Sequence, residues 1–150
     1  MQKFIGVKLV EAVEGASLVP SGKYEKGSAG YMVTYPDGYT SWCPKEVFEK
    51  YNLPVVGEKN KVDITDVYEM IADTAVATLT PDGSKSKTTA VVCTLINGFT
   101  ITETSACVDP DNYDEEVGRD ICMSKIIDKI WFLLGFLLQS AVYGFKQSEV

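Results

Sequence analysis

"NGFTITETSACVDPDNYDEEVGR", residues 97–119, decides the fold of this chain. Its opening Asn-Gly pair is the strongest short signal for a β-hairpin, and β-branched runs flank it at 90–96 and 99–104. A two-residue turn fixes the register of the two strands and places Cys93 opposite Thr102. The sequence therefore predicts a two-stranded hairpin over this part of the chain.

The second half of the same stretch predicts the start of a long helix. Acids crowd the segment 109–116, where the helix dipole favours negative charge, and the apolar pattern continues to about residue 143. Such a helix would be long enough to bend at Gly135 or to pack against another subunit. Because most of its sides are apolar from Ile126 on, we expect a homo-oligomer formed through the C-terminal helix. The predicted apolar positions are Val117, Ile121, Ile126, Ile130, Leu134, Leu137 and Val142.

Upstream of the hairpin, the sequence predicts a second helix and a module boundary. The stretch 62–79 has apolar residues at helical spacing, and Asp63 or Thr65 can cap it. A proline, a glycine and a charged cluster interrupt the pattern at 52–61. We therefore place a boundary there, which gives a small module at 1–54 and a helix, hairpin and long-helix domain at 55–150.

The first module is predicted to combine short strands with one helix. A β-rich run covers 3–13, and two aromatic and β-branched strands surround the turn Pro36-Asp37-Gly38. "CPKEVFEKYN" then predicts a helix with Cys43 at the N-cap and Pro44 as its first residue. The expected fold class is α+β.

Composition excludes several functional classes. The net charge is −7 and the pI is about 4.6, so the chain lacks the basic surface that DNA or RNA phosphates require, and we expect no polymeric nucleic acid partner. The absence of histidine removes Ser-His-Asp and Cys-His catalysis, and the four cysteines have no Cys-x-x-Cys spacing. We expect no cofactor and no bound metal.

Hydropathy argues against a membrane role. The most apolar run, at 131–138, is far shorter than the roughly 20 residues that a bilayer requires. The first ten residues lack the apolar core of a signal peptide. We therefore expect no membrane association and a cytoplasmic location.

Two residues of the opening stretch are open to alternative interpretations. Cys107 is either a nucleophile near a helix N-terminus or a small packed residue, and the missing base favours packing. Arg119 is the only arginine. It stands four residues after Glu115, so it either forms a surface ion pair or clamps a phosphate or carboxylate.

Other polar and aromatic side chains are candidates for binding a ligand. Thr102 and Ser105 can donate hydrogen bonds, and exposed aromatic rings can stack on a base. With Arg119 for the phosphate, the candidate stacking residues are Tyr39, Trp42 and Tyr113. The acids at 109–120 superficially resemble a calcium loop, but that loop requires glycine where Asp114 stands.

The segment "LINGFTITETSACVDPDNYDEEVGRDICMSKIIDKIWFLLGFLLQ" resembles the phage gene-product-49 family of small tailed-phage proteins. With the preceding helix, the resemblance covers about residues 62–142. The chain departs from the family pattern at Thr104, where glutamate is usual, and at Tyr113, where phenylalanine is usual. The matching residues are Asn97, Gly98, Phe99, Ser105, Ala106, Cys107, Pro110, Asn112, Gly118, Arg119, Lys129, Ile130 and Trp131.

The run "GYTSWCPKEVFEKY" (38–51) is similar to a module of small phage and prophage proteins, some of which counter bacterial immunity. Cys43 stands where serine is usual in that module. The resemblance implies a phage or prophage accessory protein in the cytoplasm of an infected bacterium. We expect a non-enzymatic sponge that sequesters a nucleotide-derived immune signal, such as a cyclic oligonucleotide or an ADP-ribose derivative.

Three other functions stay open at the level of sequence. The chain could inhibit a host protein through its acidic surface, hydrolyse an immune signal, or form part of the virion. Turnover lost on changing Cys107 or Glu103 would favour the hydrolase.

Overall fold

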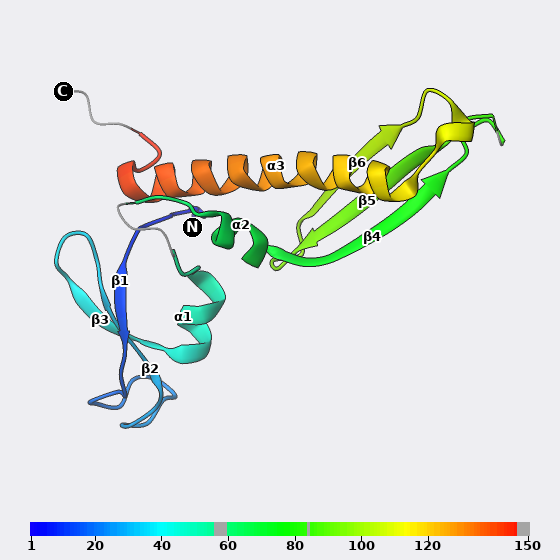
Figure 1. Ribbon diagram of the computed structural model, residues 1–150. Coiled ribbons are helices and arrows are strands. Elements are labelled where there is room, and N and C mark those ends of the chain that lie inside the picture. Colours follow the sequence, from blue (N-terminus) through cyan, green and yellow to red (C-terminus); the bar gives the residue numbers. More distant parts are fainter. Residues whose placement is uncertain (56–59, 84, 147–150) are drawn as a thin grey trace. The chain divides into compact units, whose positions relative to one another are not determined.

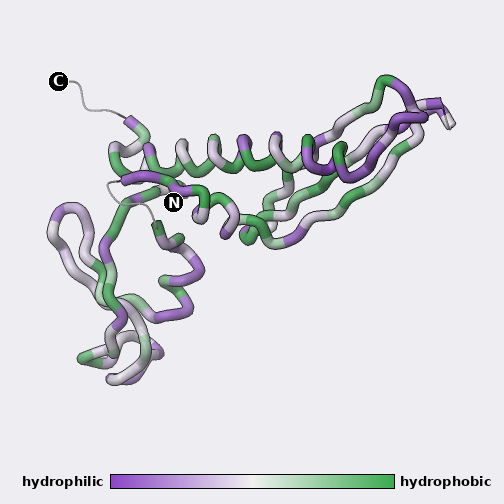
Figure 2. Tube along the Cα trace, in the orientation of Figure 1, coloured by the Kyte–Doolittle hydropathy of each residue, from purple (hydrophilic) through white to green (hydrophobic). Residues whose placement is uncertain are grey.

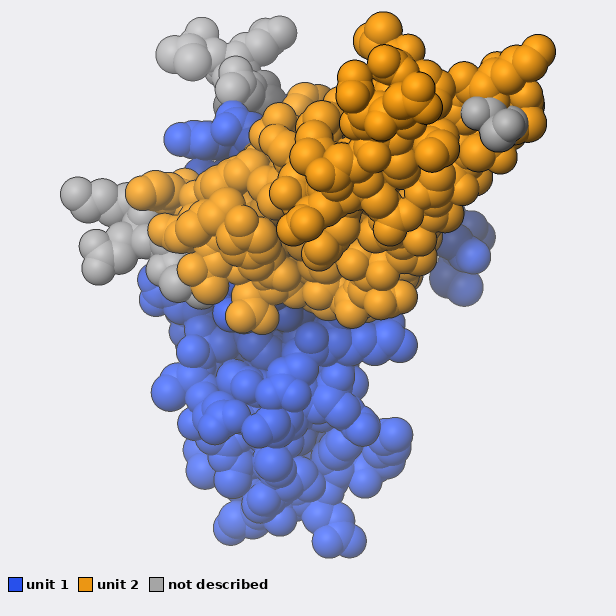
Figure 3. Space-filling view, turned by 45° about the vertical axis from the view of Figure 1, so that its right-hand side comes forward, with its two compact units in different colours: residues 1–55, 136–150 blue, residues 56–135 orange. Residues whose placement is uncertain are grey.

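The computed structural model describes residues 1–55, 60–83 and 85–146. The chain forms two compact units, one of residues 1–55 with 136–150 and the other of residues 56–135 (Figure 3). The predicted boundary segment at 52–61 lies partly outside the described residues. Each unit has a three-stranded antiparallel sheet and helical residues, so the α+β class is confirmed.

The first unit is a β-meander followed by a short helix (Figure 1). Strands β1 (Glu11–Glu14), β2 (Gly30–Thr34) and β3 (Thr40–Pro44) pair in sequential order. The predicted strand over 3–13 is wrong for most of its length, because β2 is only five residues long and offers partners to Glu11–Glu14 alone.

Helix α1 (Lys45–Tyr51) begins one residue later than predicted. Pro44 is still extended, with φ −56° and ψ 142°, and pairs with Gly30, so it is the N-cap in place of Cys43. No side chain caps the helix N-terminus. Cys43 belongs to strand β3 instead of capping the helix.

The two hairpins share one turn geometry. Tyr35 N donates to Tyr39 O at 2.8 Å, and Leu95 N donates to Phe99 O at the same distance. The third loop residue of each turn is a glycine with φ of 86°, a left-handed conformation that costs glycine little. In the first turn the Asp37 side chain accepts from Tyr39 N, and in the second the Asn97 side chain accepts from Phe99 N.

This turn corrects the predicted register. Three residues, not two, separate Leu95 from Phe99, so the strands shift by one position. Cys93 lies opposite Ile101, and Thr102 lies opposite Val92. The Asn-Gly pair correctly predicts a hairpin here. The loop, however, has three residues in place of two, and Gly98 is the third.

The second unit contains one more strand than predicted. Helix α2 (Ile64–Glu69) is followed by β4 (Ile71–Leu79), β5 (Thr88–Leu95) and β6 (Thr100–Ala106), in that order across the sheet. A 3₁₀ turn, η1 (Pro110–Asn112), precedes helix α3 (Glu115–Tyr143).

The predicted helix over 62–79 is therefore wrong after Glu69. Asp63 does cap α2, through a capping box with Asp66. After Met70, however, residues 71–79 pair with β5 along their length, with one irregularity between Ile71 and Asp73. Hydrogen bonding to β5 along the whole segment stabilises a strand here, although the apolar residues have helical spacing.

The core of this unit lies between the sheet and one face of α3. In β5, Thr89, Val91, Cys93 and Leu95 are buried at period two. On α3, the buried residues recur every four positions, at Cys122, Ile126, Ile130 and Leu134.

Helix α3 is continuous past Gly135, as the unbroken ribbon in Figure 1 shows. Hydrophobic colour prevails over its second half in Figure 2. Of the predicted apolar positions, Ile126, Ile130 and Leu134 are buried, whereas Val117, Ile121 and Leu137 are exposed. In the first turns of α3, Gly118 and Cys122 are buried instead. Within the described residues, no helix has the length and hydropathy needed to cross a membrane.

Candidate functional site

A chain of hydroxyl groups links the start of α3 to strands β4 and β5. Tyr113 Oη lies 2.7 Å from Thr78 Oγ1 and 2.7 Å from Thr89 Oγ1. Thr78 also donates to a Glu115 carboxylate oxygen at 2.5 Å. Each hydroxyl has one proton, so the donors run from Thr89 through Tyr113 and Thr78 to the carboxylate. These hydrogen bonds between hydroxyl groups hold Tyr113 and Glu115 in fixed positions beside the sheet.

The close approach of α3 to β5 depends on a glycine. A Cβ on Gly118 would lie 2.1 Å from Thr89 Oγ1, which is closer than any side chain tolerates. Gly118 is buried, and the Cys122 thiol one turn later donates to the Thr89 carbonyl at 3.7 Å. Gly118 therefore brings the first turns of α3 against the sheet.

Arg119 lines an open hollow of about 360 Å³ on the same side of the sheet. Its other lining residues are Thr74 and Val76 from β4, with Glu115 and Glu116 from α3. The side chain of Arg119 is exposed, and it forms no ion pair with any residue that the structure describes. The ion pair with Glu115, one of the two alternatives in the sequence, is therefore absent, and that carboxylate accepts from Thr78.

The acids before α3 bind backbone N–H groups. Asp109 accepts from Asp111 N at 3.0 Å, and Asp114 accepts from Glu116 N at 2.9 Å. These are the capping roles expected of acids at a helix start. Among the residues that the structure describes, no three cysteine or carboxylate side chains converge on a possible metal position.

Thr102 and Ser105 lie on opposite faces of β6. The exposed Thr102 faces away from α3, whereas Ser105 is half-buried and shares its face with the buried Ile101. The sheet therefore does not direct both side chains at one point.

Tyr39 and Trp42 belong to the first unit. Trp42 Nε1 donates to the Gly15 carbonyl at 3.0 Å, and its ring meets Tyr24 edge-on at 5.9 Å between centroids. Tyr39 is 64% exposed, and one neighbour of its ring is Tyr35 at 6.0 Å. Trp42 thus helps to pack its unit, while Tyr39 stands open to solvent.

Buried thiols are poor candidates for chemistry. Cys93 and Cys122 are fully buried, and burial raises the pKa of both thiols. Cys107 is half-buried, and its thiol donates to the Asp109 carbonyl.

A family model described as "Phage protein (N4 Gp49/phage Sf6 gene 66) family" matches residues 59–142. The chain belongs to this phage protein family. The match covers more than half of the chain and confirms the resemblance seen in the sequence. Comparison with curated proteins and with solved structures gives no match.

The matched segment of this phage protein includes the whole hollow around Arg119 and the hydroxyl chain. The hydroxyl of Tyr113 joins two threonines. The sequence did not point to Thr74 and Thr78, because 62–79 is predicted as a helix, or to Thr89, which precedes the predicted strand at 90–96. The period-two pattern of residues 71–79 was the available signal.

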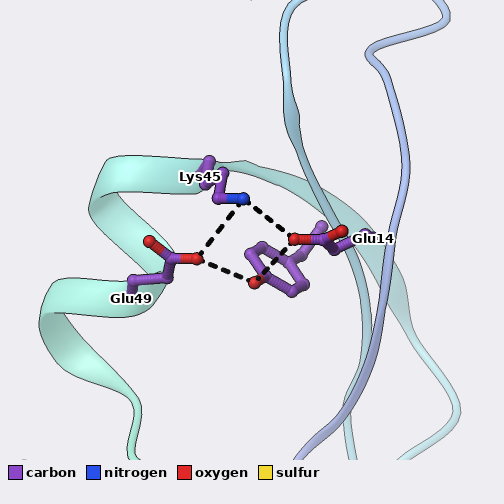
Figure 4. A network of polar contacts seen from close by, with 4 residues as sticks. Glu14, Lys45 and Glu49 are labelled. Atoms are coloured by element: carbon purple, nitrogen blue, oxygen red, sulfur yellow. Dashed lines mark hydrogen bonds and ion pairs between the residues drawn. The ribbon is translucent and has the colours of Figure 1, made fainter.

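Outside the matched segment, the phage protein has a second polar cluster that the sequence did not predict (Figure 4). Lys45 Nζ lies 3.0 Å from Glu14 and 3.8 Å from Glu49, and Tyr31 Oη lies 2.9 Å from Glu49. Lys45 lowers the pKa of Glu14, and Glu49 raises the pKa of Tyr31. The cluster joins β1, β2 and α1, and all four polar groups are already paired.

Proposed function

We propose that this phage accessory protein is an anti-defence sponge, which binds a nucleotide-derived immune signal of the bacterial host and sequesters it without catalysis. The observation that carries the proposal is Arg119. It is the only arginine, it is exposed in a hollow, and it lacks an ion-pair partner among the described residues.

An arginine in this position suits a phosphate. The planar guanidinium offers five N–H donors in a fork that matches phosphate oxygens two at a time. Thr74 lines the same hollow and adds a polar side chain. The hollow of about 360 Å³ is at the lower end of the range for small-molecule sites, so a larger signal would also need contacts outside it.

The remaining ligand contacts are assigned from exposure. Among the three stacking candidates, Tyr39 has the most exposed side chain, while Tyr113 and Trp42 are half-buried. Lys87 Nζ already lies 5.5 Å from the Tyr113 ring centroid and adds positive charge there. Thr102 and Ser105 face opposite ways, so they would donate hydrogen bonds to ligands through different surfaces of an oligomer.

Association through the C-terminal helix is part of the proposal. Phe132 is 79% exposed and Phe136 is 66% exposed, although both are large apolar residues on α3. Helical spacing puts them on one side of the helix, where a second copy would remove them from water. The signal would then bind between subunits.

The test is retention of intact ligand. The protein is incubated with candidate cyclic oligonucleotides and ADP-ribose derivatives, freed of unbound nucleotide, and heated. We expect wild-type protein to release the intact signal, and Arg119→Ala to lose at least tenfold in affinity by calorimetry, about 1.4 kcal/mol. Arg119→Lys should recover only part of this loss.

Lys26→Ala is the matched control, because Lys26 is an exposed cation that does not line the hollow. It should bind like wild type. Failure of every candidate to be retained would reject the sponge, and release of a cleaved product would favour the hydrolase.

The alternative is inhibition of a host protein through the acidic surface. Its support is the exposed acids of η1 and the first turns of α3, in particular Asp111, Glu116 and Asp120. A stoichiometric host protein that is captured by wild type, and lost when these three residues are changed to amides, would favour this function over the sponge.

A further inference from the structure

One edge of the second sheet is open, and most of its length carries no charged side chain. Strand β4 is an outer strand of nine residues, and residues 74–79, "TAVATL", contain no charged side chain. Proteins usually protect such edges with charges, prolines or covering segments, because the unpaired backbone pairs readily with another strand.

The opposite edge, strand β6, is protected. Lys125 Nζ donates to the Thr104 carbonyl at 3.0 Å, and Glu103 of the same strand forms an ion pair with Lys129. Lysines along an edge discourage pairing with a further strand. Among the described residues, no such contact to the outer backbone groups of β4 is present.

The hydrogen-bond pattern identifies the groups that β4 turns outward. The Leu95 N–H donates to Phe99 O and the Lys87 carbonyl accepts from Cys107 N, so the backbone groups of both residues point towards β6. The Ile96 N–H donates to Met70 O, on the β4 side. Because directions alternate along a strand, the even-numbered residues of β5 bond to β4. Their partners are the odd-numbered residues from Asp73 to Leu79. The N–H and C=O groups of Thr74, Val76 and Thr78 therefore point to the open edge.

These three residues are self-complementary. Two copies of β4 that run antiparallel about a two-fold axis at Val76 pair Thr74 with Thr78 of the other copy, and Val76 with itself. All three outward-facing residues then find hydrogen-bonding partners in both copies. Registers centred on Thr74 or Thr78 leave some of them unpaired.

Charge complementarity supports the same register. Glu115 lies beside Thr78, to which it is hydrogen-bonded, and Arg119 lies one helical turn further on, in the hollow that Thr74 also lines. The two-fold axis places Thr78 of one copy, with the neighbouring Glu115, opposite Thr74 of the other copy. Arg119 then faces Glu115 and Glu116 of the second copy, which gives the lone arginine acidic partners.

The geometry points to a second copy of this chain as the partner of the β4 edge, in a continuous six-stranded sheet centred on Val76. This association goes beyond the proposed function, because it requires no ligand and uses a surface other than the exposed apolar residues of α3. A contact formed mainly by one short strand and its copy is small, so we expect the fraction of dimer to rise with protein concentration.

Proline substitutions test which edge is used. Val76→Pro removes an N–H that points outward and leaves the bonds between β4 and β5 intact. We expect it to fold normally by circular dichroism and to halve the mass measured by sedimentation. Thr102→Pro is the matched control, since its N–H points out of the β6 edge. It should keep the wild-type mass.

Disulfide formation tests the register. Val76→Cys places two thiols on residues whose Cα atoms are about 5.5 Å apart across the axis, within the range for a disulfide. Leu79→Cys places them about 20 Å apart along the paired strands. Peptide mapping after oxidation should find a 76–76 link and no 79–79 link.

Charge reversal tests the pairing of Arg119. Arg119→Glu and Glu116→Lys should each weaken self-association, and mixing the two variants should restore a complex that contains one copy of each. The inference is overturned if wild type is monomeric throughout a concentration series, if Val76→Pro keeps the wild-type mass, or if the 79–79 link forms instead.

Discussion

At the scale of single residues, Tyr113 shows how one hydroxyl organises the start of α3. Its Oη accepts from the fully buried Thr89 and donates to Thr78, which in turn donates to Glu115. Phenylalanine would fill the same space without these bonds. The sequence placed Tyr113 among the ligand candidates, but it could not reveal the threonines, which come from two strands far from it in the chain.

Tyr113→Phe is expected to destabilise the fold by about 1 kcal/mol, because it removes the acceptor of the buried Thr89 hydroxyl. Chemical denaturation measures the difference. In a protein that already carries Thr89→Val, Tyr113→Phe should lower the free energy of unfolding by less than it does in wild type, since the Thr89 hydroxyl that needs an acceptor is gone. Strict additivity of the two changes would contradict the hydrogen-bond chain.

The ion pair of Glu103 with Lys129 predicts a dependence of stability on pH. The hydrogen bond from Lys129 lowers the pKa of Glu103, whose side chain is only 17% exposed. Its contribution is therefore present above the unfolded glutamate pKa of about 4.3 and is lost as the pH falls through the lower folded pKa.

Lys129→Met should melt at a lower temperature than wild type at pH 7, and the difference should shrink below about pH 4. Lys26→Met serves as a control without an ion pair among the described residues. A difference that stays constant across this pH range would contradict the role of Glu103.

At the scale of elements, the sequence predicted those features whose signals are local. The turns at Pro36-Asp37-Gly38 and Asn97-Gly98, the Asp63 cap of α2 and the acidic start of α3 all depend on neighbouring residues, and the structure contains them. Strand β4 depends on pairing with β5, which the spacing of its apolar residues did not reveal. The error at β4 also hid the hollow, because Thr74 and Val76 lie within the predicted helix over 62–79.

Two glycines of α3 make opposite predictions for the same substitution. Gly118→Ala should destabilise the fold by roughly 1–3 kcal/mol, because its Cβ would collide with Thr89. Gly135→Ala should stabilise it by about 0.5–1 kcal/mol, since no atom lies within 4 Å of the new Cβ and alanine favours the helix. Thermal denaturation compares the two. Equal effects would contradict the close packing of α3 at Thr89.

At the scale of the whole molecule, Arg119 connects the proposed function with the proposed edge-to-edge dimer. A guanidinium with five N–H donors can bind a carboxylate across the two-fold axis and still offer donors to a phosphate. The sequence identified Arg119 as the residue to examine, and left open whether Glu115 neutralises it. The structure pairs Glu115 with Thr78, so the arginine is available to a partner.

Native mass spectrometry of the protein purified from a bacterium with an active signalling defence tests the sponge most directly. We predict an oligomer that carries an added mass equal to an intact nucleotide-derived signal, present in wild type and in Lys26→Ala and lost in Arg119→Ala. An oligomer without added mass, or one whose added mass persists in Arg119→Ala, would contradict the central claim that Arg119 holds the signal.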